Sequence, residues 1–106
     1  LVSFSSDRGG TWTDARAEPM LVDYGFADEG SVVSDPQSGL LYFSHPDAHD
    51  RSNLTVYRSI DDAVSWPEEG QRTVYAGSAA YSDMAILNPA PAGQGNVVGV
   101  FFERDS

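Results

Sequence analysis

The feature that most constrains the fold of this chain is an internal repeat. Residues 5–12, SSDRGGTW, recur in degraded form as residues 59–66, SIDDAVSW. The serine, the aspartate and the tryptophan of the two copies are each separated by 54 residues. Each copy follows a short apolar run. A period of about 50 residues with strand and turn content is typical of β-propeller blades, so the repeat predicts two neighbouring blades.

Short apolar runs occupy much of the rest of the chain. They are rich in β-branched and aromatic residues and are bounded by Gly, Pro, Asp or Ser, which is the pattern of strands and turns. The runs lie at residues 1–4, 32–33, 40–43, 54–57, 73–75, 84–87 and 97–102. No window keeps a helical apolar period for more than two turns. The sequence therefore predicts an all-β fold of antiparallel strands, with a turn at residues 35–39 and a loop through Pro89, Pro91, Gly93 and Gly95.

The repeated pattern, S-x-D-x-G-x-T-W, is an Asp box, and its residue types suit a hairpin turn. A short carboxylate can accept the backbone N–H groups that a turn leaves unpaired, a glycine permits a positive φ, and a tryptophan supplies a large apolar surface. Structural roles, rather than catalytic ones, are therefore predicted for Ser5, Asp7, Gly9, Thr11 and Trp12 in the first box and for Ser59, Asp61, Ser65 and Trp66 in the second. We expect Asp7 and Asp61 at hairpin tips on one outer face and both tryptophans largely buried. Ala63 replaces the glycine in the second box, which predicts a more strained turn there.

Composition argues against several classes of function. The formal net charge is −10, from 16 acidic residues and 6 arginines without lysine, and such a field repels nucleic acid. Cysteine is absent, so neither a disulfide framework nor a thiolate metal site can form. No run approaches the roughly 20 apolar residues that span a membrane. The chain begins with Leu1 and ends directly after an apolar run, so we expect it to be a piece of a longer protein.

One group of side chains raises the question of a metal site. His45, Asp47, His49 and Asp50 fall within six positions of one another. We expect a polar loop here instead, because Pro46 interrupts the group and no predicted element fixes its geometry. Neither a metal nor another cofactor is predicted.

Three further segments resemble the sialidase (neuraminidase) family. Residues 51–56, RSNLTV, are similar to the family's segment in which an arginine precedes an N-L-T strand. Residues 77–85, GSAAYSDMA, resemble its G-x-x-x-Y-S-D-L-A stretch, with Met84 in place of leucine. Residues 100–103, VFFE, are similar to a late strand that ends in an acidic residue. The resemblance covers nearly the whole chain, and the tyrosine segment is its most specific part.

The resemblance implies an exo-α-sialidase that removes terminal α-linked sialic acid from glycoproteins, gangliosides or oligosaccharides. By this resemblance Tyr81 is the nucleophile, Arg51 is one of three arginines that bind the substrate carboxylate, and Glu103 orients another of them. A neutral phenol suits the task, because the carboxylate on the anomeric carbon repels an anionic nucleophile. The paired glutamate, the acid/base aspartate and the other two arginines lie upstream of Leu1, so the isolated chain is expected to be inactive.

The resemblance also implies a domain plan. Residues 1–106 form part of a six-bladed Asp-box propeller, with one blade containing the box at 5–12, a second containing the box at 59–66, and a last strand at 96–103. A secreted or cell-surface bacterial parent is compatible with this plan. Tyr81 and Arg51 are expected to share a cleft opposite the Asp boxes, about one sugar apart, with Glu103 nearby. Two alternatives stay open, namely a non-catalytic propeller that binds glycans or proteins, and a trans-sialidase.

Overall fold

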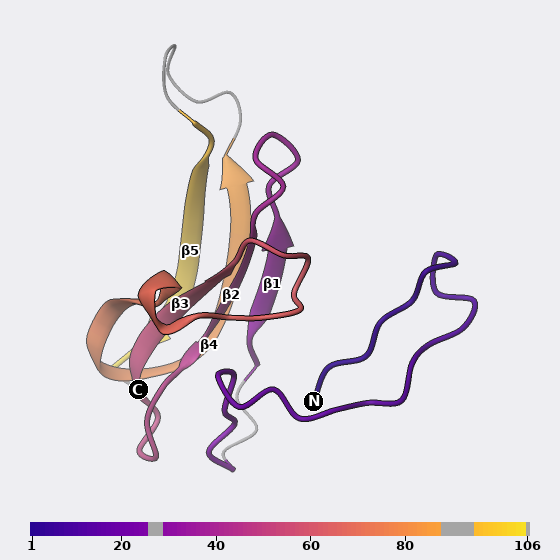
Figure 1. Cartoon of the computed structure of the whole chain (residues 1–106). Coiled ribbons are helices and arrows are strands. Elements are labelled where there is room, and N and C mark those ends of the chain that lie inside the picture. The colour runs from indigo at the N-terminus through magenta and orange to yellow at the C-terminus, as the bar shows by residue number, and fades with distance from the viewer. Residues whose placement is uncertain (26–28, 88–94, 106) are drawn as a thin grey trace.

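The chain folds into a five-stranded antiparallel sheet that curls into a half-barrel (Figure 1). The computed structural model describes residues 1–25, 29–87 and 95–105. Neighbouring strands in the sequence are also neighbours in the sheet. The elements are β1 (Ser31–Ser34), β2 (Leu41–Pro46), β3 (Ser52–Ser59), the 3-10 helix η1 (Glu68–Gly70), β4 (Arg72–Leu87) and β5 (Val97–Arg104). The predicted all-β class with antiparallel strands is confirmed.

Strand β4 accounts for the curl of the sheet. Its 16 residues pair first with β3 and then, from Ala79 onward, with β5. The two apolar runs at 73–75 and 84–87, which the sequence presents as separate strands, are thus one bent strand (Figure 1). The second half of β4 returns across β2, where the buried hydroxyl groups of Ser44 and Ser82 lie 2.7 Å apart.

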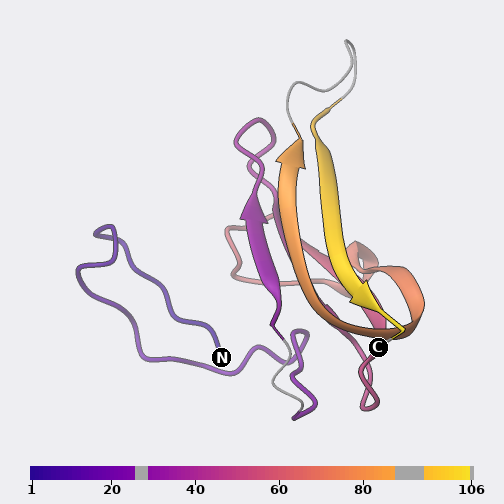
Figure 2. The same ribbon diagram turned by 180° about the vertical axis from the view of Figure 1, so that it is seen from behind.

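The second half of β4 also lies beside β1 and runs in the same direction (Figures 1 and 2). The N–H of Ser82 donates to the carbonyl oxygen of Glu29 at 3.1 Å, and the N–H of Met84 donates to Oγ of Ser31 at 3.1 Å. These contacts bring the first strand of the sheet against the fourth. Polar contacts therefore hold β1 against the second half of β4 on this side of the half-barrel.

The predicted turn at residues 35–39 connects β1 and β2. Asp35 accepts hydrogen bonds from the N–H of Gln37 and the hydroxyl of Ser38, and Gly39 takes a φ of +75°, which a glycine adopts without strain. The predicted loop through Pro89, Pro91 and Gly93 lies outside the described residues. Among the described residues, no helix has the length and apolar character needed to cross a bilayer.

The core lies between β2, β3 and the second half of β4. Its buried apolar side chains are Leu54, Tyr57, Trp66, Ala79, Ala80 and Met84. The ring of Phe43 packs against Tyr57 and Trp66, with centroids 5.9 Å and 6.4 Å away. His45 belongs to this region too, since it lies buried in β2 and stacks on Phe43. The expectation that His45 sits in a polar loop is therefore wrong, because β2 continues through Pro46 before the loop begins.

Residues 1–16 form a separate hairpin beside the sheet (Figure 2). Val2 pairs with Arg16, and the N–H of Thr13 donates to the carbonyl oxygen of Phe4. Trp12 is 63% exposed, so the prediction that it is largely buried is wrong, whereas Trp66 is 3% exposed as predicted. The physical reason is the lack of an apolar layer, because this hairpin joins no strand of the five-stranded sheet.

Candidate functional site

The first Asp box is a closed set of hydrogen bonds around Asp7. One carboxylate oxygen accepts the N–H of Thr11 at 2.8 Å and the hydroxyl of Ser5 at 2.8 Å. The other accepts the hydroxyl of Thr11 at 2.7 Å. The hydroxyl oxygen of Ser5 in turn accepts the N–H of Gly9 at 2.7 Å, and Trp12 Nε1 donates to the carbonyl oxygen of Gly9 at 3.1 Å.

The second box repeats the serine and aspartate contacts of this set around Asp61, but among the described residues the buried Nε1 of Trp66 has no counterpart of the hydrogen bond that Trp12 makes to Gly9. Its carboxylate accepts the N–H of Ser65 at 2.8 Å, the hydroxyl of Ser65, and the hydroxyl of Ser59 at 2.8 Å. The hydroxyl oxygen of Ser59 accepts the N–H of Ala63 at 3.0 Å. Serine replaces Thr11 without loss of a hydrogen bond, so the sequence repeat is also a repeat of local structure.

Both box carboxylates are stabilised in the ionised form. Hydrogen bonds from the Thr11 side chain and backbone, and then from Ser5, lower the pKa of Asp7 from 3.8 to about 2. The equivalent donors, led by the Ser65 side chain, also lower the pKa of Asp61. A carboxylate whose acceptor sites are occupied by its own turn is a poor proton acceptor near neutral pH. The geometry therefore favours the structural role that the sequence predicts for the boxes.

Three predicted site residues meet at the opposite end of the sheet. Arg51 directly precedes β3, whereas Asp61 follows it, so the length of an eight-residue strand, about 26 Å, separates the two ends. The guanidinium carbon of Arg51 lies 6.0 Å from the ring centroid of Tyr81. The N–H of Tyr81 makes a long hydrogen bond of 3.5 Å to Oε2 of Glu103. The loop before β3, the bend of β4 and the end of β5 therefore converge here (Figures 1 and 2).

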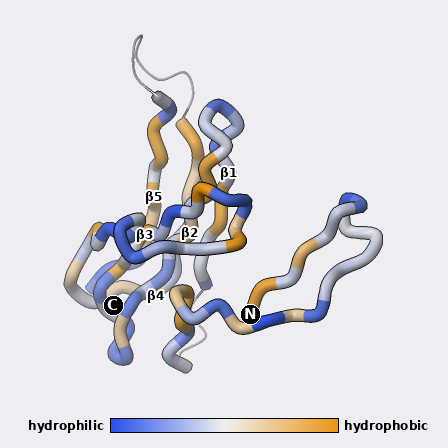
Figure 3. The backbone as a smooth tube through the Cα atoms, viewed as in Figure 1, coloured by the Kyte–Doolittle hydropathy of each residue, from blue (hydrophilic) through white to orange (hydrophobic). Residues whose placement is uncertain are grey.

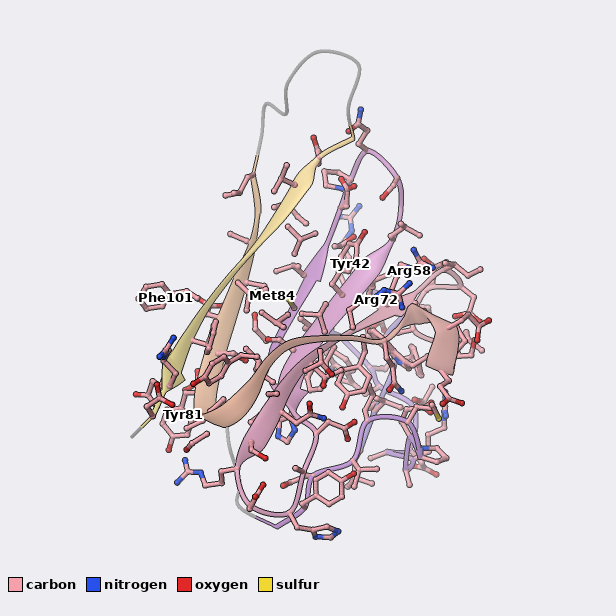
Figure 4. All side chains as sticks on the ribbon, turned by 90° about the vertical axis from the view of Figure 1, so that its left-hand side faces the viewer. Tyr42, Arg58, Arg72, Tyr81, Met84 and Phe101 are labelled. Atoms are coloured by element: carbon pink, nitrogen blue, oxygen red, sulfur yellow. The ribbon has the colours of Figure 1, made fainter. Side chains whose placement is uncertain are left out.

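Tyr81 is presented to solvent by a β-bulge. Ala79 pairs with Arg104 and Ser82 with Phe102, so that Ala80 and Tyr81 together face the single residue Glu103. Ala79 and Ala80 are both buried, while Tyr81 is 47% exposed. The extra residue thus interrupts the regular alternation of side chains between the two faces of β4, and the phenol of Tyr81 points outward. Bulges of this kind often re-aim a side chain beside a functional site. Figure 4 shows Tyr81 at the bend of β4.

Arg51 is also held by irregular backbone. Its φ is +55° and that of Asn53 is +63°, both in the left-handed region that non-glycine residues adopt at a cost. The pairing between β3 and β4 shifts register on both sides of Leu54. The carbonyl oxygen of Arg51 accepts the N–H of Ala79 at 2.7 Å, which ties the arginine to the bulged strand. Strained backbone of this kind clusters at functional sites.

Two grooves in the described part of the chain lie away from this cluster. One, of about 510 Å³, lies between the N-terminal segment and the sheet, beside Phe43, His45 and Trp66. The other, of about 340 Å³, follows the outer side of β4 and β5 from Asp83 to Leu87. Neither is lined by Arg51, Tyr81 or Glu103. Within residues 1–25, 29–87 and 95–105, no three His, Cys, Asp or Glu side chains form a group suited to a metal ion.

Sequence reasoning identified the three clustered residues but missed what supports them. No residue pattern in the sequence predicts the bulge at Ala80 or the buried contact between Ser44 and Ser82. The only signal was the motif around Tyr81, in which Ser82 follows directly.

Comparison with known proteins adds no relative from which function could be transferred, because neither a protein-family model nor a curated protein sequence matches this chain.

Proposed function

We propose that this chain is part of an Asp-box β-propeller sialidase and contributes its tyrosine nucleophile. The observation that carries the proposal is the convergence of Arg51, Tyr81 and Glu103 at one end of the sheet. These residues come from three separate segments, and each was singled out by a different motif. A guanidinium, a half-exposed phenol and a carboxylate at one place match the chemistry of a carboxylated sugar.

The topology supports a propeller assignment. Strands β1, β2, β3 and the first half of β4 form a four-stranded antiparallel meander, which is the plan of a blade. An Asp box lies between the third and fourth strands. The second half of β4 and β5 would then begin the next blade. In that arrangement β1 and the second half of β4 would be the inner strands of neighbouring blades, which fits their parallel course.

In the proposed reaction the phenol oxygen of Tyr81 attacks the anomeric carbon of sialic acid. The bond from that carbon to the leaving oxygen breaks, the leaving oxygen gains a proton from an acid, and the phenol proton passes to a base. Water then cleaves the bond to tyrosine and releases sialic acid. Because the pKa of a free phenol is about 10, the base is essential, and we assign it and the acid to residues outside this chain.

In this proposal Arg51 binds the substrate carboxylate, and Glu103 orients a second arginine. A planar guanidinium forms paired hydrogen bonds to a carboxylate and stays charged at all relevant pH values. Arg51 would hold the carboxylate of sialic acid beside the Tyr81 ring, over which its guanidinium already lies. Glu103, across the bulge from Tyr81, would orient a second arginine of the complete site.

The test compares Tyr81→Phe with Tyr42→Phe in the complete protein that contains residues 1–106. Tyr42 lies on β2, away from the cluster, and loses the same hydroxyl (Figure 4). We expect Tyr81→Phe to remove most turnover of a fluorogenic sialoside while preserving its binding, and Tyr42→Phe to leave turnover unchanged. Sialoside binding without turnover in the wild-type protein would instead support a non-catalytic propeller. Normal turnover by Tyr81→Phe would contradict the proposal.

A further inference from the structure

The hydroxyl groups of Ser44 and Ser82 form a hydrogen bond directly behind Tyr81. Their oxygen atoms lie 2.7 Å apart, Ser44 is fully buried, and Ser82 is 6% exposed. Ser82 follows Tyr81 in β4, and Ser44 lies on β2, which is not paired with β4 in the sheet. This contact therefore fixes the position of β4 across the half-barrel rather than along a ladder of paired strands.

The contact also selects one register for the strand. Side chains alternate between the two faces of a strand, so a slip by one residue exchanges the faces. In the observed register Ser82 faces Ser44, and Tyr81 and Asp83 face outward. A slip in either direction would bring the phenol of Tyr81 or the carboxylate of Asp83 into the buried position. Because a bulge inserts an extra residue and weakens the local ladder, such a slip is a real alternative at this site.

Backbone contacts on both sides support the same register. Before the bulge, the N–H of Ala79 donates to the carbonyl oxygen of Arg51 at 2.7 Å. After it, the N–H of Ser82 donates to Glu29, and Oγ of Ser31 donates to the carboxylate of Asp83 at 2.9 Å. Tyr81 itself makes only the long hydrogen bond to Glu103 among these contacts. The neighbours of Tyr81 hold its backbone while its side chain stays half-exposed.

We infer that Ser44 and Ser82 are positioning residues that hold the β4 bulge so that the Tyr81 phenol stays exposed beside Arg51. The inference rests on the function proposed above. Neither serine touches substrate, since both are buried. Their hydroxyl pair acts through the backbone of Tyr81. Misplacement of a reacting group by about 1 Å can cost ~100-fold in rate, so loss of the hydrogen bond between Ser44 and Ser82 should reduce turnover.

The test is a double-mutant cycle with Ser44→Ala, Ser82→Ala and both together, in the complete protein that contains this chain. Each single change leaves one buried hydroxyl without its partner and should lower stability. The double change replaces both with apolar groups, so the unfolding midpoint should return close to that of the wild type. We expect kcat of the double variant to remain ~10- to 100-fold lower, with little change in KM. A purely structural role predicts instead that kcat recovers together with stability.

Ser59→Ala supplies the matched control. Ser59 is also fully buried and its hydroxyl is hydrogen-bonded, but it belongs to the Asp box at the other end of β3. This variant should unfold more readily while kcat per folded molecule stays unchanged. Wild-type kcat in the Ser44→Ala/Ser82→Ala variant would overturn the inference if Tyr81→Phe is inactive. If Tyr81→Phe retains turnover, the proposed function itself fails, and the two failures are thereby told apart.

Discussion

Ala63 shows at the scale of one residue how the degraded repeat keeps its shape. It takes a φ of +66°, directly after Asp62 at +58°, where the first box has Gly9 at +89° after Arg8 at +60°. A left-handed conformation costs an L-residue with a Cβ roughly 1–2 kcal/mol. The expectation of a strained second turn agrees with this geometry. The turn persists because the hydrogen bonds around Asp61 are all made.

Replacing Ala63 with glycine should therefore stabilise the protein by roughly 0.5–1 kcal/mol. The change relieves the backbone strain, and the greater backbone entropy of glycine in the unfolded chain offsets part of that gain. Gly9→Ala should destabilise the first box for the same reason. A Cβ at Gly9 would lie 3.6 Å from Trp12, an ordinary contact, so that cost comes from the backbone alone. Urea unfolding midpoints measure both changes, and a lower midpoint for Ala63→Gly would refute the explanation.

Asp7 gives a prediction for pH dependence. Its pKa in the folded hairpin is about 2, below the ordinary value of 3.8. A carboxyl group whose folded pKa is depressed contributes stability above its unfolded pKa and loses that contribution as pH falls through the folded pKa. The first hairpin should therefore loosen between about pH 4 and pH 2. The NMR shift of the Thr11 amide should follow this titration, and Asp7→Asn should abolish it. A titration of that amide centred at or above pH 4 would contradict the account.

At the scale of elements, the bend in β4 depends on Gly77. A Cβ at this position would come within 2.7 Å of the Tyr75 hydroxyl and 2.8 Å of its ring. That ring cannot move freely, because its hydroxyl donates to Asp105 at 2.7 Å and Arg104 lies over it at 4.9 Å. The glycine thus lets the strand turn from β3 toward β5 while the end of β5 stays in contact.

Gly77→Ala should consequently destabilise the protein by about 1–3 kcal/mol, the usual cost of overpacking. In a Tyr75→Leu background, which removes the ring, the same change should cost clearly less. Differential scanning calorimetry of the four proteins gives the coupling between the two positions. Equal penalties in both backgrounds would show that the ring is not what the added methyl group meets.

The sequence specified the strands better than their connections. Runs of β-branched and aromatic residues, bounded by turn residues, predicted where chain segments are extended, because these signals are local. The union of residues 73–75 and 84–87 in one strand was not predictable, since it depends on a change of partner from β3 to β5. The burial of Trp12 was predicted wrongly for a related reason. A side chain is buried only if another surface covers it, and that surface is not encoded in the box itself.

At the scale of the whole molecule, one face of the sheet exposes apolar side chains. Leu87 and Val97 are about half-exposed, and Phe101 is 85% exposed and projects away from β5 (Figure 4). Figure 3 shows hydrophobic residues along much of β4 and β5. In the described part of the chain, β5 pairs only with β4, so its other edge offers unpaired backbone groups.

We therefore expect the isolated 106-residue chain to associate with itself and to unfold without sharp cooperativity. Phe101→Glu should weaken this association, because it places a charge on the apolar face of a chain that is already strongly acidic. Sedimentation velocity over a range of concentrations measures the effect, and Phe4→Glu, on the separate hairpin, is the comparison. A monodisperse monomer with a sharp, reversible melt would contradict the expectation.

The proposed reaction requires that Tyr81 form a covalent bond to the substrate. The most direct measurement is mass spectrometry of the complete protein, quenched in acid during turnover of a sialoside and digested with protease. We expect the peptide containing Tyr81 to gain the mass of one sialyl residue, and the corresponding peptide of Tyr81→Phe to show no gain. Active turnover with the sialyl mass on another residue, or with none on any peptide under conditions that trap the intermediate, would contradict it.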